Sequence, residues 1–229
     1  GPERECDLPR SGGRDPAVED AELTPLDLPE ESPIDAAHDV GGDQSAPRGE
    51  QPKPVVWSRD GASVVITTAE NGSSNLKRVT IASGKIEPVT TGRHDVVAYT
   101  ASKDGVTLAA TISTQTNIGD LSIVKSTGTS QQPALITHVN EALFSGIAQS
   151  EPEEIWYSSF DGRKVQGWVL KPPDFDSARK YPMILQIHGG PHSAYGNVYT
   201  HEFHWMAGNG YVVLFTNPRG STTYAQEFG

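Results

Sequence analysis

The chain has 229 residues, of which 35% are hydrophobic, and 29 acidic against 18 basic side chains give it a formal net charge of −11. A hydrophobic share this low indicates that part of the chain adds nothing to a core. Neither half is basic, which argues against nucleic acid or an anionic membrane surface as the main partner.

Cys6 is the one cysteine, so the chain can form neither an intramolecular disulfide nor a CxxC metal or redox site. A lone cysteine is compatible with a reducing compartment such as the cytoplasm. No apolar run is long enough to span a bilayer. The chain opens with Gly1-Pro2 rather than Met. We therefore expect its native start to be missing, and export stays open.

Residues 1–52 are expected to form an acidic, proline-rich leader. The first aromatic residue is Trp57, and residues 1–53 hold 14 acidic against 5 basic side chains. Nine of the 17 prolines lie within the first 54 positions. Such a segment cannot bury enough apolar surface to offset its conformational entropy, so we predict loop or disorder here.

Short β-branched runs separated by turn residues begin near residue 54. The turn Ser58-Arg59-Asp60-Gly61 precedes a strand-like run at 63–68, and Asn71-Gly72 precedes another at 76–82. Asp-Gly and Asn-Gly suit tight hairpins, because those turns need positive φ. The sequence therefore predicts antiparallel hairpins in this region.

The same turn pattern recurs 44 residues later. Ser102-Lys103-Asp104-Gly105 precedes a further strand-like run at 106–112. A four-stranded propeller blade takes about 40–45 residues, so the period matches one blade. Asp-Gly hairpins occur in all-β folds generally, and the periodicity by itself leaves a β-sandwich equally open.

The predicted secondary structure changes after residue 150, from hairpins alone to a hairpin followed by a strand–helix–strand unit. A hairpin is predicted from 154–158 and 164–170 through Asp161-Gly162, and 183–187 reads as a strand buried on both sheet faces. A helix at 198–207, closed by a left-handed glycine cap in Gly208-Asn209-Gly210, leads to a strand at 211–216. Strand, helix and strand in this order predict a parallel pair.

We also expect the chain to stop in mid-domain at Gly229. A sheet with so few strands would keep an open edge and an uncovered face, so this piece should be poorly stable alone.

The sharpest chemical motif is His188-Gly189-Gly190-Pro191, directly after the strand at 183–187. In α/β-hydrolases a glycine-rich loop in this place turns a backbone N–H towards the oxyanion of an acyl-transfer intermediate. Glycine is needed because the backbone must approach the substrate closely. An ordinary tight turn between strand and helix is the alternative.

The chain resembles the prolyl oligopeptidase family of serine peptidases, particularly its acylaminoacyl-peptidase and dipeptidyl-aminopeptidase-like branch. The resemblance rests on Asp161-Gly162 and on residues 165–173, 181–192, 208–213 and 217–222. It extends through Trp57-Ser58-Arg59-Asp60-Gly61, and faintly through residues 39–43, to the family's propeller, whereas residues 1–34 match nothing in it. The family usually has glycine where Thr223 and Ala225 stand.

This resemblance implies two partial domains, one all-β and one α/β. Residues 53–150 would be the C-terminal blades of a β-propeller, and residues 151–229 the N-terminal part of an α/β-hydrolase domain. The full enzyme would cleave short peptides with a serine nucleophile, a histidine base and an orienting aspartate. No G-x-S-x-G occurs here, and Ser193 lacks the flanking glycines. We therefore expect the triad beyond residue 229 and no activity in this chain alone.

The expected site residues belong to the glycine-rich loop and its surroundings. The backbone N–H of Gly190 is the predicted oxyanion donor, and His188, Gly189, Pro191 and Arg219 are predicted to lie near the substrate. Arg219 has a second interpretation, an ion pair with a carboxylate that positions a loop. The resemblance implies no cofactor and leaves oligomer formation open.

His201 and His204 flank Glu202 on the predicted helix and invite a zinc interpretation. The zincin pattern requires histidines four apart with glutamate directly after the first. The spacing here is three. We therefore predict no metal site, and expect these histidines to be packed or solvated.

Two further functions stay open on the sequence. The chain could be a propeller-type binding module joined to an inactive hydrolase remnant, or part of an esterase or lipase, since hydrolases share the glycine loop. A downstream G-x-S-x-G followed by Asp and His would favour the enzyme.

Overall fold

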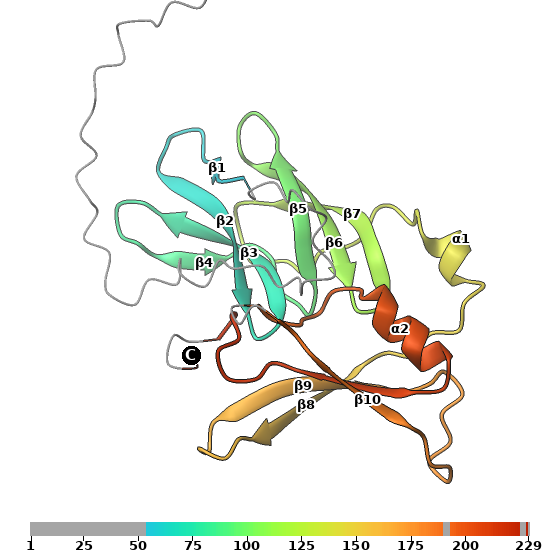
Figure 1. The fold of residues 1–229 in the computed structure, drawn as a ribbon. Helices are drawn as coiled ribbons and strands as arrows, with labels where there is room; N and C mark the ends of the chain where they lie inside the picture. Colours follow the sequence, from blue (N-terminus) through green and yellow to red (C-terminus); the bar gives the residue numbers. More distant parts are fainter. Residues whose placement is uncertain (1–53, 190–192, 225–227, 229) are drawn as a thin grey trace, which may run out of the picture. The chain divides into compact units, whose positions relative to one another are not determined.

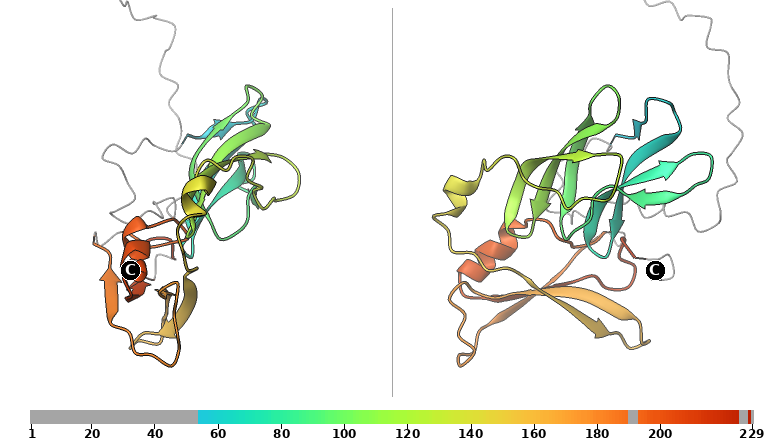
Figure 2. Two further views of the ribbon diagram at one scale, coloured as in Figure 1. Left: turned by 90° about the vertical axis from the view of Figure 1, so that its right-hand side faces the viewer. Right: turned by 180° about the vertical axis from the view of Figure 1, so that it is seen from behind.

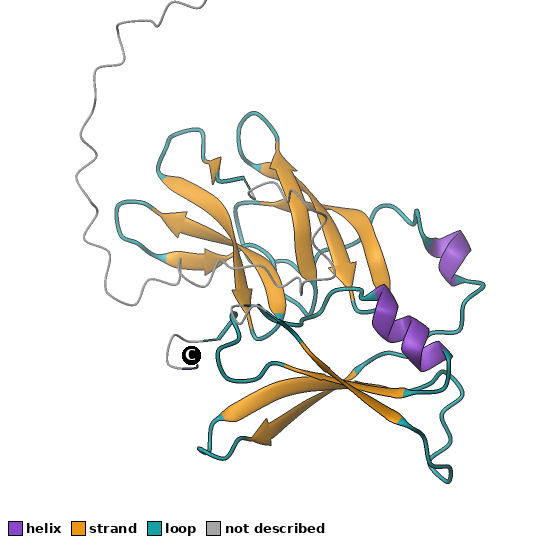
Figure 3. Ribbon diagram, in the orientation of Figure 1, coloured by secondary structure: helices purple, strands orange, loops and turns teal. Residues whose placement is uncertain are grey.

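The computed structural model describes residues 54–189, 193–224 and 228, and in them it shows three β-sheets and two short helices (Figures 1 and 3). The leader predicted for residues 1–52 lies outside the described residues. Neither helix in the described part is long and apolar enough to cross a membrane. The chain is therefore rich in sheet, as the sequence predicts.

The first sheet is an antiparallel meander in the order β1-β2-β3-β4. A two-residue turn, Asn71-Gly72, joins the long strands β2 and β3 and pairs Glu70 with Ser73. The strand predicted at 76–82 therefore starts earlier, directly after the turn. The bounds are β1 Val56–Trp57, β2 Ser63–Glu70, β3 Ser73–Thr80 and β4 Ile86–Pro88.

The second sheet is a three-stranded antiparallel meander in the order β5-β6-β7, which corresponds to the first three strands of the first sheet. Its strands are β5 Asp95–Ala101, β6 Thr107–Thr114 and β7 Asn117–Lys125, and the short helix α1, Glu141–Phe144, follows. The strands β2 and β6 start 44 positions apart, at Ser63 and Thr107. The 44-residue repeat seen in the sequence is therefore a repeat of structure.

A recurring side-chain arrangement explains why both turns form. Ser58 donates a hydrogen bond to Asp60 at 2.7 Å, and Ser102 donates one to Asp104 at 2.5 Å. The same aspartates accept a backbone N–H two residues on, at 3.0 Å in both turns. These hydrogen bonds stabilise the carboxylates and lower the pKa of each aspartate below its ordinary value.

One apolar cluster is shared by the first two sheets. Side chains that alternate along each strand point to the same face, and those of β2, β3, β5, β6 and β7 meet there. Leu76, Val96, Leu108 and Ala110 have no exposed surface. The cluster consists of Val65, Leu76, Val89, Val96, Tyr99, Leu108, Ala110, Ile112 and Val124.

The third sheet is mixed and has the order β10-β11-β9-β8. β8 and β9 form the predicted hairpin, and β10 lies parallel to β11 as the strand–helix–strand pattern predicts. The helix α2 packs against β11 and β9 (Figure 2). The bounds are β8 Glu153–Ser158, β9 Lys164–Leu170, β10 Met183–Ile187, α2 His201–Gly208 and β11 Val212–Thr216.

A second cluster, mainly aromatic, lies between α2 and this sheet. Trp168 is fully buried and stacks on Phe215 with ring centroids 5.4 Å apart. The ring centroid of Phe203, in α2, lies 4.6 Å from that of Phe215. The cluster consists of Trp168, Leu170, Tyr195, Phe203, Ala207, Val213 and Phe215.

Two sequence predictions are wrong in this region. The strand at 183–187 was predicted to be buried on both faces. In the structure β10 is an edge strand of the described sheet, and Met183, Leu185 and Ile187 are 61%, 50% and 64% exposed. The helix starts at His201 rather than 198, because Thr200 before it has an extended backbone, with φ −122° and ψ 101°. The left-handed glycine after it is Gly210, with φ +88°.

Candidate functional site

The candidate site lies where the parallel strands β10 and β11 end. Because the two strands are parallel, their carboxyl ends meet at one edge of the sheet, which is where open α/β sheets place their ligands. His188 and Gly189 follow β10, and Asn217 follows β11. Gly190 and Pro191 lie outside the described residues, so the oxyanion role of Gly190 stays a prediction.

His188 is half-buried and held by the segment after β11. Its Nε2 lies 2.7 Å from the hydroxyl oxygen of Ser221, and its Nδ1 lies 3.0 Å from the carbonyl oxygen of Gly189. The Ser221 hydroxyl donates to the carbonyl of Pro218 at 2.6 Å, so it accepts a hydrogen bond from the imidazole. The ring also packs edge-on against Tyr195. The start of the glycine loop is thus tied to Ser221.

Asn217 ties the far side of the loop to the same strand end. Its side chain is fully buried. It accepts the N–H of Tyr195 at 2.7 Å and donates to the carbonyl of Tyr195 at 2.8 Å. It also donates to the hydroxyl of Tyr224 at 2.7 Å. Burial raises the pKa of Tyr224 to about 12, so this hydroxyl keeps its proton at neutral pH and donates to Gln166 at 2.6 Å.

Arg219 takes up an ion pair. Its guanidinium pairs with the carboxylate of Asp161, in the β8–β9 hairpin, and its Nε donates to the carbonyl oxygen of Phe228 at 2.7 Å. The guanidinium also lies 5.8 Å from the centroid of the Phe228 ring. This geometry corresponds to the loop-positioning interpretation left open by the sequence.

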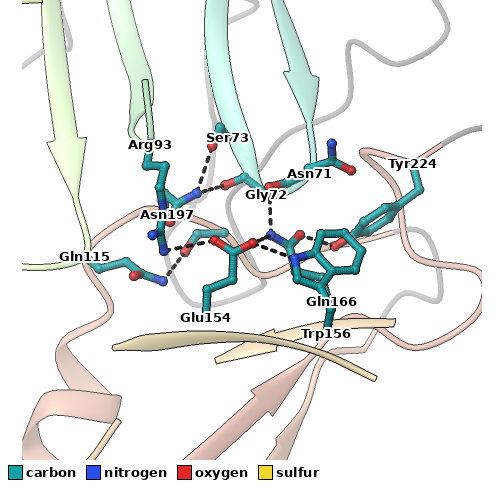
Figure 4. Close-up of polar contacts among 11 residues, drawn as sticks. Asn71, Gly72, Ser73, Arg93, Gln115, Glu154, Trp156, Gln166, Asn197 and Tyr224 are labelled. Carbon is teal, nitrogen blue, oxygen red and sulfur yellow. Dashed lines mark hydrogen bonds and ion pairs between the residues drawn. The ribbon is translucent and has the colours of Figure 1, made fainter. Parts of the chain in front are cut away.

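The β2–β3 turn contacts Asn197 and Gln166, as Figure 4 shows. Asn197 donates from its backbone N–H to the carbonyl of Gly72 at 2.6 Å, and from its side chain to Ser73 at 2.8 Å. Gln166 donates to the carbonyl of Asn71 at 3.1 Å. The equivalent turn of the second sheet does the same, since Gln115 donates to the carbonyl of Gly196 at 3.2 Å.

Glu154 closes the network on the side of β8. One carboxylate oxygen accepts from Trp156 at 2.7 Å and from Gln166 at 3.0 Å, and the other lies 3.0 Å from the guanidinium of Arg93. Four polar groups, from Trp156, Arg93, Asn71 and Tyr224, therefore converge on the half-buried carboxylate of Glu154 and the buried amide of Gln166.

The histidines of α2 form no metal centre within the described residues. His204 donates through Nε2 to the carbonyl of Gln115 at 2.6 Å and stacks on Tyr199. Burial lowers the pKa of His204 below its ordinary value. This histidine is packed as a neutral hydrogen-bond donor between α2 and the second sheet.

Sequence reasoning missed Asn197, Gln166 and Ser221, whose partners lie far away along the chain. One signal was available at Thr223, where the family usually has glycine. Thr223 has φ +72°, in the left-handed region that favours glycine. The departure from the family pattern therefore marks a position whose backbone is constrained.

Comparisons with known proteins agree with this geometry. No protein-family model matches the chain. The chain is 32% identical over 180 residues to the uncharacterized peptidase YuxL of Bacillus subtilis, covering 79% of this chain and 27% of YuxL. It is 29% identical over 178 residues to dipeptidyl-peptidase 5 of Porphyromonas gingivalis, covering 76% of this chain and 25% of that protein.

Solved structures give the same result. The acylaminoacyl peptidase of Pyrococcus horikoshii matches with a TM-score of 0.63 and 28% identity, over 73% of this chain and 25% of that chain. The fold is also that of Porphyromonas gingivalis dipeptidyl peptidase 4, with a TM-score of 0.61 at 19% identity. These similarities place the chain among the peptidases.

Within that class, the chain belongs to the prolyl oligopeptidase family, also called family S9. It spans about a quarter of the length of the curated relatives that it matches.

Proposed function

We propose that the whole protein is a serine-type peptidase that hydrolyses short peptides through an acyl-enzyme. The observation that carries the proposal is the strand β10, which lies parallel to its neighbour β11 and leads directly into His188 and Gly189 of the glycine-rich motif. The relatives are named as dipeptidyl and acylaminoacyl peptidases, which supports short peptides as the substrate class.

The proposal includes a domain arrangement. Residues 53–150 are assigned to a partial β-propeller, because two successive antiparallel sheets have corresponding strands, β2 and β6, that start 44 residues apart. Residues 151–229 are assigned to the N-terminal part of an α/β-hydrolase domain, because a hairpin leads into a parallel pair joined through α2. Peptides would then bind where the propeller faces the strand ends.

The chemistry assigned to this chain is stabilisation and positioning. The backbone N–H of Gly190 donates to the oxyanion of the tetrahedral intermediate, and such a donor contributes about 10²–10³ to kcat. His188, Gly189 and Pro191 shape the loop beside the substrate carbonyl, and Arg219 fixes the hairpin that carries Asp161. The nucleophile, base and orienting acid lie outside this chain, which has no activity by itself.

The test uses the full-length protein encoded by the extended reading frame. A fluorophosphonate probe is expected to label one serine in a G-x-S-x-G beyond residue 229, and to leave Ser193 unlabelled. Cleavage is measured on acyl-aminoacyl and dipeptidyl substrates beside simple esters of similar size. Labelling of Ser193, or turnover of esters alone, would refute the proposal. Absence of any labelled serine would instead support the binding-module alternative.

A further inference from the structure

The turn Asn71-Gly72 is bonded in an unusual way for a hairpin tip. Both residues have positive φ, +49° and +70°, so the turn is of type I′. The backbone groups of such a tip normally face water. Here all four, the N–H and carbonyl of each residue, bond to residues at least 95 positions further along the chain. The tip is therefore docked.

Gly72 fits this place because it has no side chain. A Cβ at position 72 would lie 2.8 Å and 2.9 Å from two ring atoms of Trp168, and 3.3 Å from the Cα of Gly196. Trp168 cannot yield easily, since it is fully buried and stacked on Phe215. The turn thus rests directly on the aromatic cluster of the mixed sheet.

Thr223 holds the N–H side of the turn. Its carbonyl accepts the N–H of Asn71 at 3.0 Å, and its hydroxyl oxygen accepts the N–H of Gly72 at 3.3 Å. Thr223 is β-branched and yet left-handed, a conformation that persists only where the surroundings impose it. A glycine here would relax the backbone but could not offer the hydroxyl.

Asn197 holds the carbonyl side of the turn and lies at the far end of the glycine loop. Its backbone N–H and its side-chain amide both donate to the carbonyl of Gly72, at 2.6 Å and 3.2 Å. Thr222, the residue before Thr223, also contacts the loop, because its N–H donates to the carbonyl of Ser193 at 3.0 Å. Ser221, next to Thr222, holds His188.

We propose that the Asn71-Gly72 turn is a positioning element for the glycine-rich loop between His188 and Asn197. The turn fixes Asn197 directly at one end, and through the 221–223 segment it fixes His188 at the other. This inference rests on the proposed function, because the loop matters as the carrier of the oxyanion donor. A misplacement of about 1 Å in such a loop lowers the rate of the chemical step by about a hundredfold.

The first test compares Gly72→Ala with Gly84→Ala in the full-length enzyme. Both glycines lie in turns with positive φ, +70° and +64°, but a Cβ at position 84 meets nothing within 4 Å. Gly72→Ala is expected to lower kcat by about tenfold to a hundredfold with little change in KM, since the loop carries the transition-state contact rather than ground-state binding. Gly84→Ala should match the wild type. Equal kcat for the two variants would overturn the proposal.

A second pair of variants keeps the test valid if Gly72→Ala fails to fold. Thr223→Val retains the shape of threonine but loses the hydroxyl that accepts the N–H of Gly72, whereas Thr223→Ser keeps it. We expect lowered kcat for the valine variant and recovery in the serine variant. A loss of kcat in both variants to the same degree would speak for a purely steric role and against positioning by this hydrogen bond.

Hydrogen exchange gives a readout that does not depend on peptidase activity. The amide of Asn197 donates to Gly72, so its exchange should accelerate by about tenfold or more in Thr223→Val and Gly72→Ala, and stay unchanged in Gly84→Ala. Unchanged exchange refutes positioning even in an active enzyme. Faster exchange with unchanged kcat also refutes it, whereas an inactive wild type with faster exchange in the variants refutes only the proposed peptidase function.

Discussion

Two glycine turns of the first sheet have similar local chemistry and different surroundings. The turn Ser58-Arg59-Asp60-Gly61 is held by itself, through Ser58 and Asp60 and a hydrogen bond from Gly61 to the Ser58 carbonyl. The turn Asn71-Gly72 is held by residues of the mixed sheet and its loops. Local sequence is enough to form a turn, but only distant partners give it a second role.

The difference between the two turns depends most on Trp168, whose ring packs against Gly72. Trp168→Ala should lower the free energy of unfolding by about 3–5 kcal/mol, because it leaves a large cavity in the aromatic cluster. Urea denaturation followed by circular dichroism measures the change. Trp205→Ala is the matched control, since this tryptophan is 61% exposed and its loss should stay within about 0.5 kcal/mol. Similar effects of the two substitutions would contradict the assigned packing.

The two Ser-x-Asp-Gly turns allow a closer comparison, and the expected loss of stability is smaller than that of Trp168→Ala. Gly61 and Gly105 have nearly the same φ, +69° and +71°, but a Cβ at position 105 would lie 2.6 Å from the Trp57 carbonyl oxygen, while one at 61 meets nothing. Gly61→Ala should cost about 1 kcal/mol of unfolding free energy through backbone strain alone. Gly105→Ala should cost at least about 2 kcal/mol, because the clash adds to the strain. Equal thermal melting temperatures would show that the second sheet does not pack against β1 in this way.

The smallest expected effect is on the pH dependence of stability. Burial lowers the pKa of His94 and His204 below the ordinary value of 6.5 in the folded protein. As the pH falls below 6.5, these histidines therefore bind protons in the unfolded chain but stay neutral in the folded one, and the folded protein loses stability. The melting temperature should drop between pH 7.5 and pH 5.5. His94→Gln should flatten this dependence, and an unchanged slope would show that His94 is not buried in its neutral form.

Much of the fold followed from local pattern. The Asp-Gly and Asn-Gly turns, the hairpin β8–β9 and the parallel pair β10–β11 were predicted from residues close together in the sequence. Errors arose at the start of α2 and at β10. The helix begins only after the extended residue Thr200, and β10 is an edge strand of the described sheet although its sequence is that of a buried one.

The residues of the candidate site likewise fall into those that the sequence predicted and those that only the structure identified. The motif around His188 and Gly189 was visible in the sequence, because its residues follow one another directly after an apolar strand. The roles of the partners that hold the motif, Ser221, Asn217 and Asn197, were not visible in the sequence, because a polar side chain gains its role from the group that it faces. Arg219 shows the same limit, since only the structure supplied Asp161 as its ion-pair partner.

The sequence alone therefore determined the turns, the strand periods and the family, since each depends on residue types at short spacing. The tertiary structure alone decided that the Asn71-Gly72 turn docks on Trp168 and that Thr223 accepts both N–H groups of that turn. The physical reason is that hydrogen bonds and steric fit act at about 3 Å, and chain folding brings within that range residues that no local pattern connects.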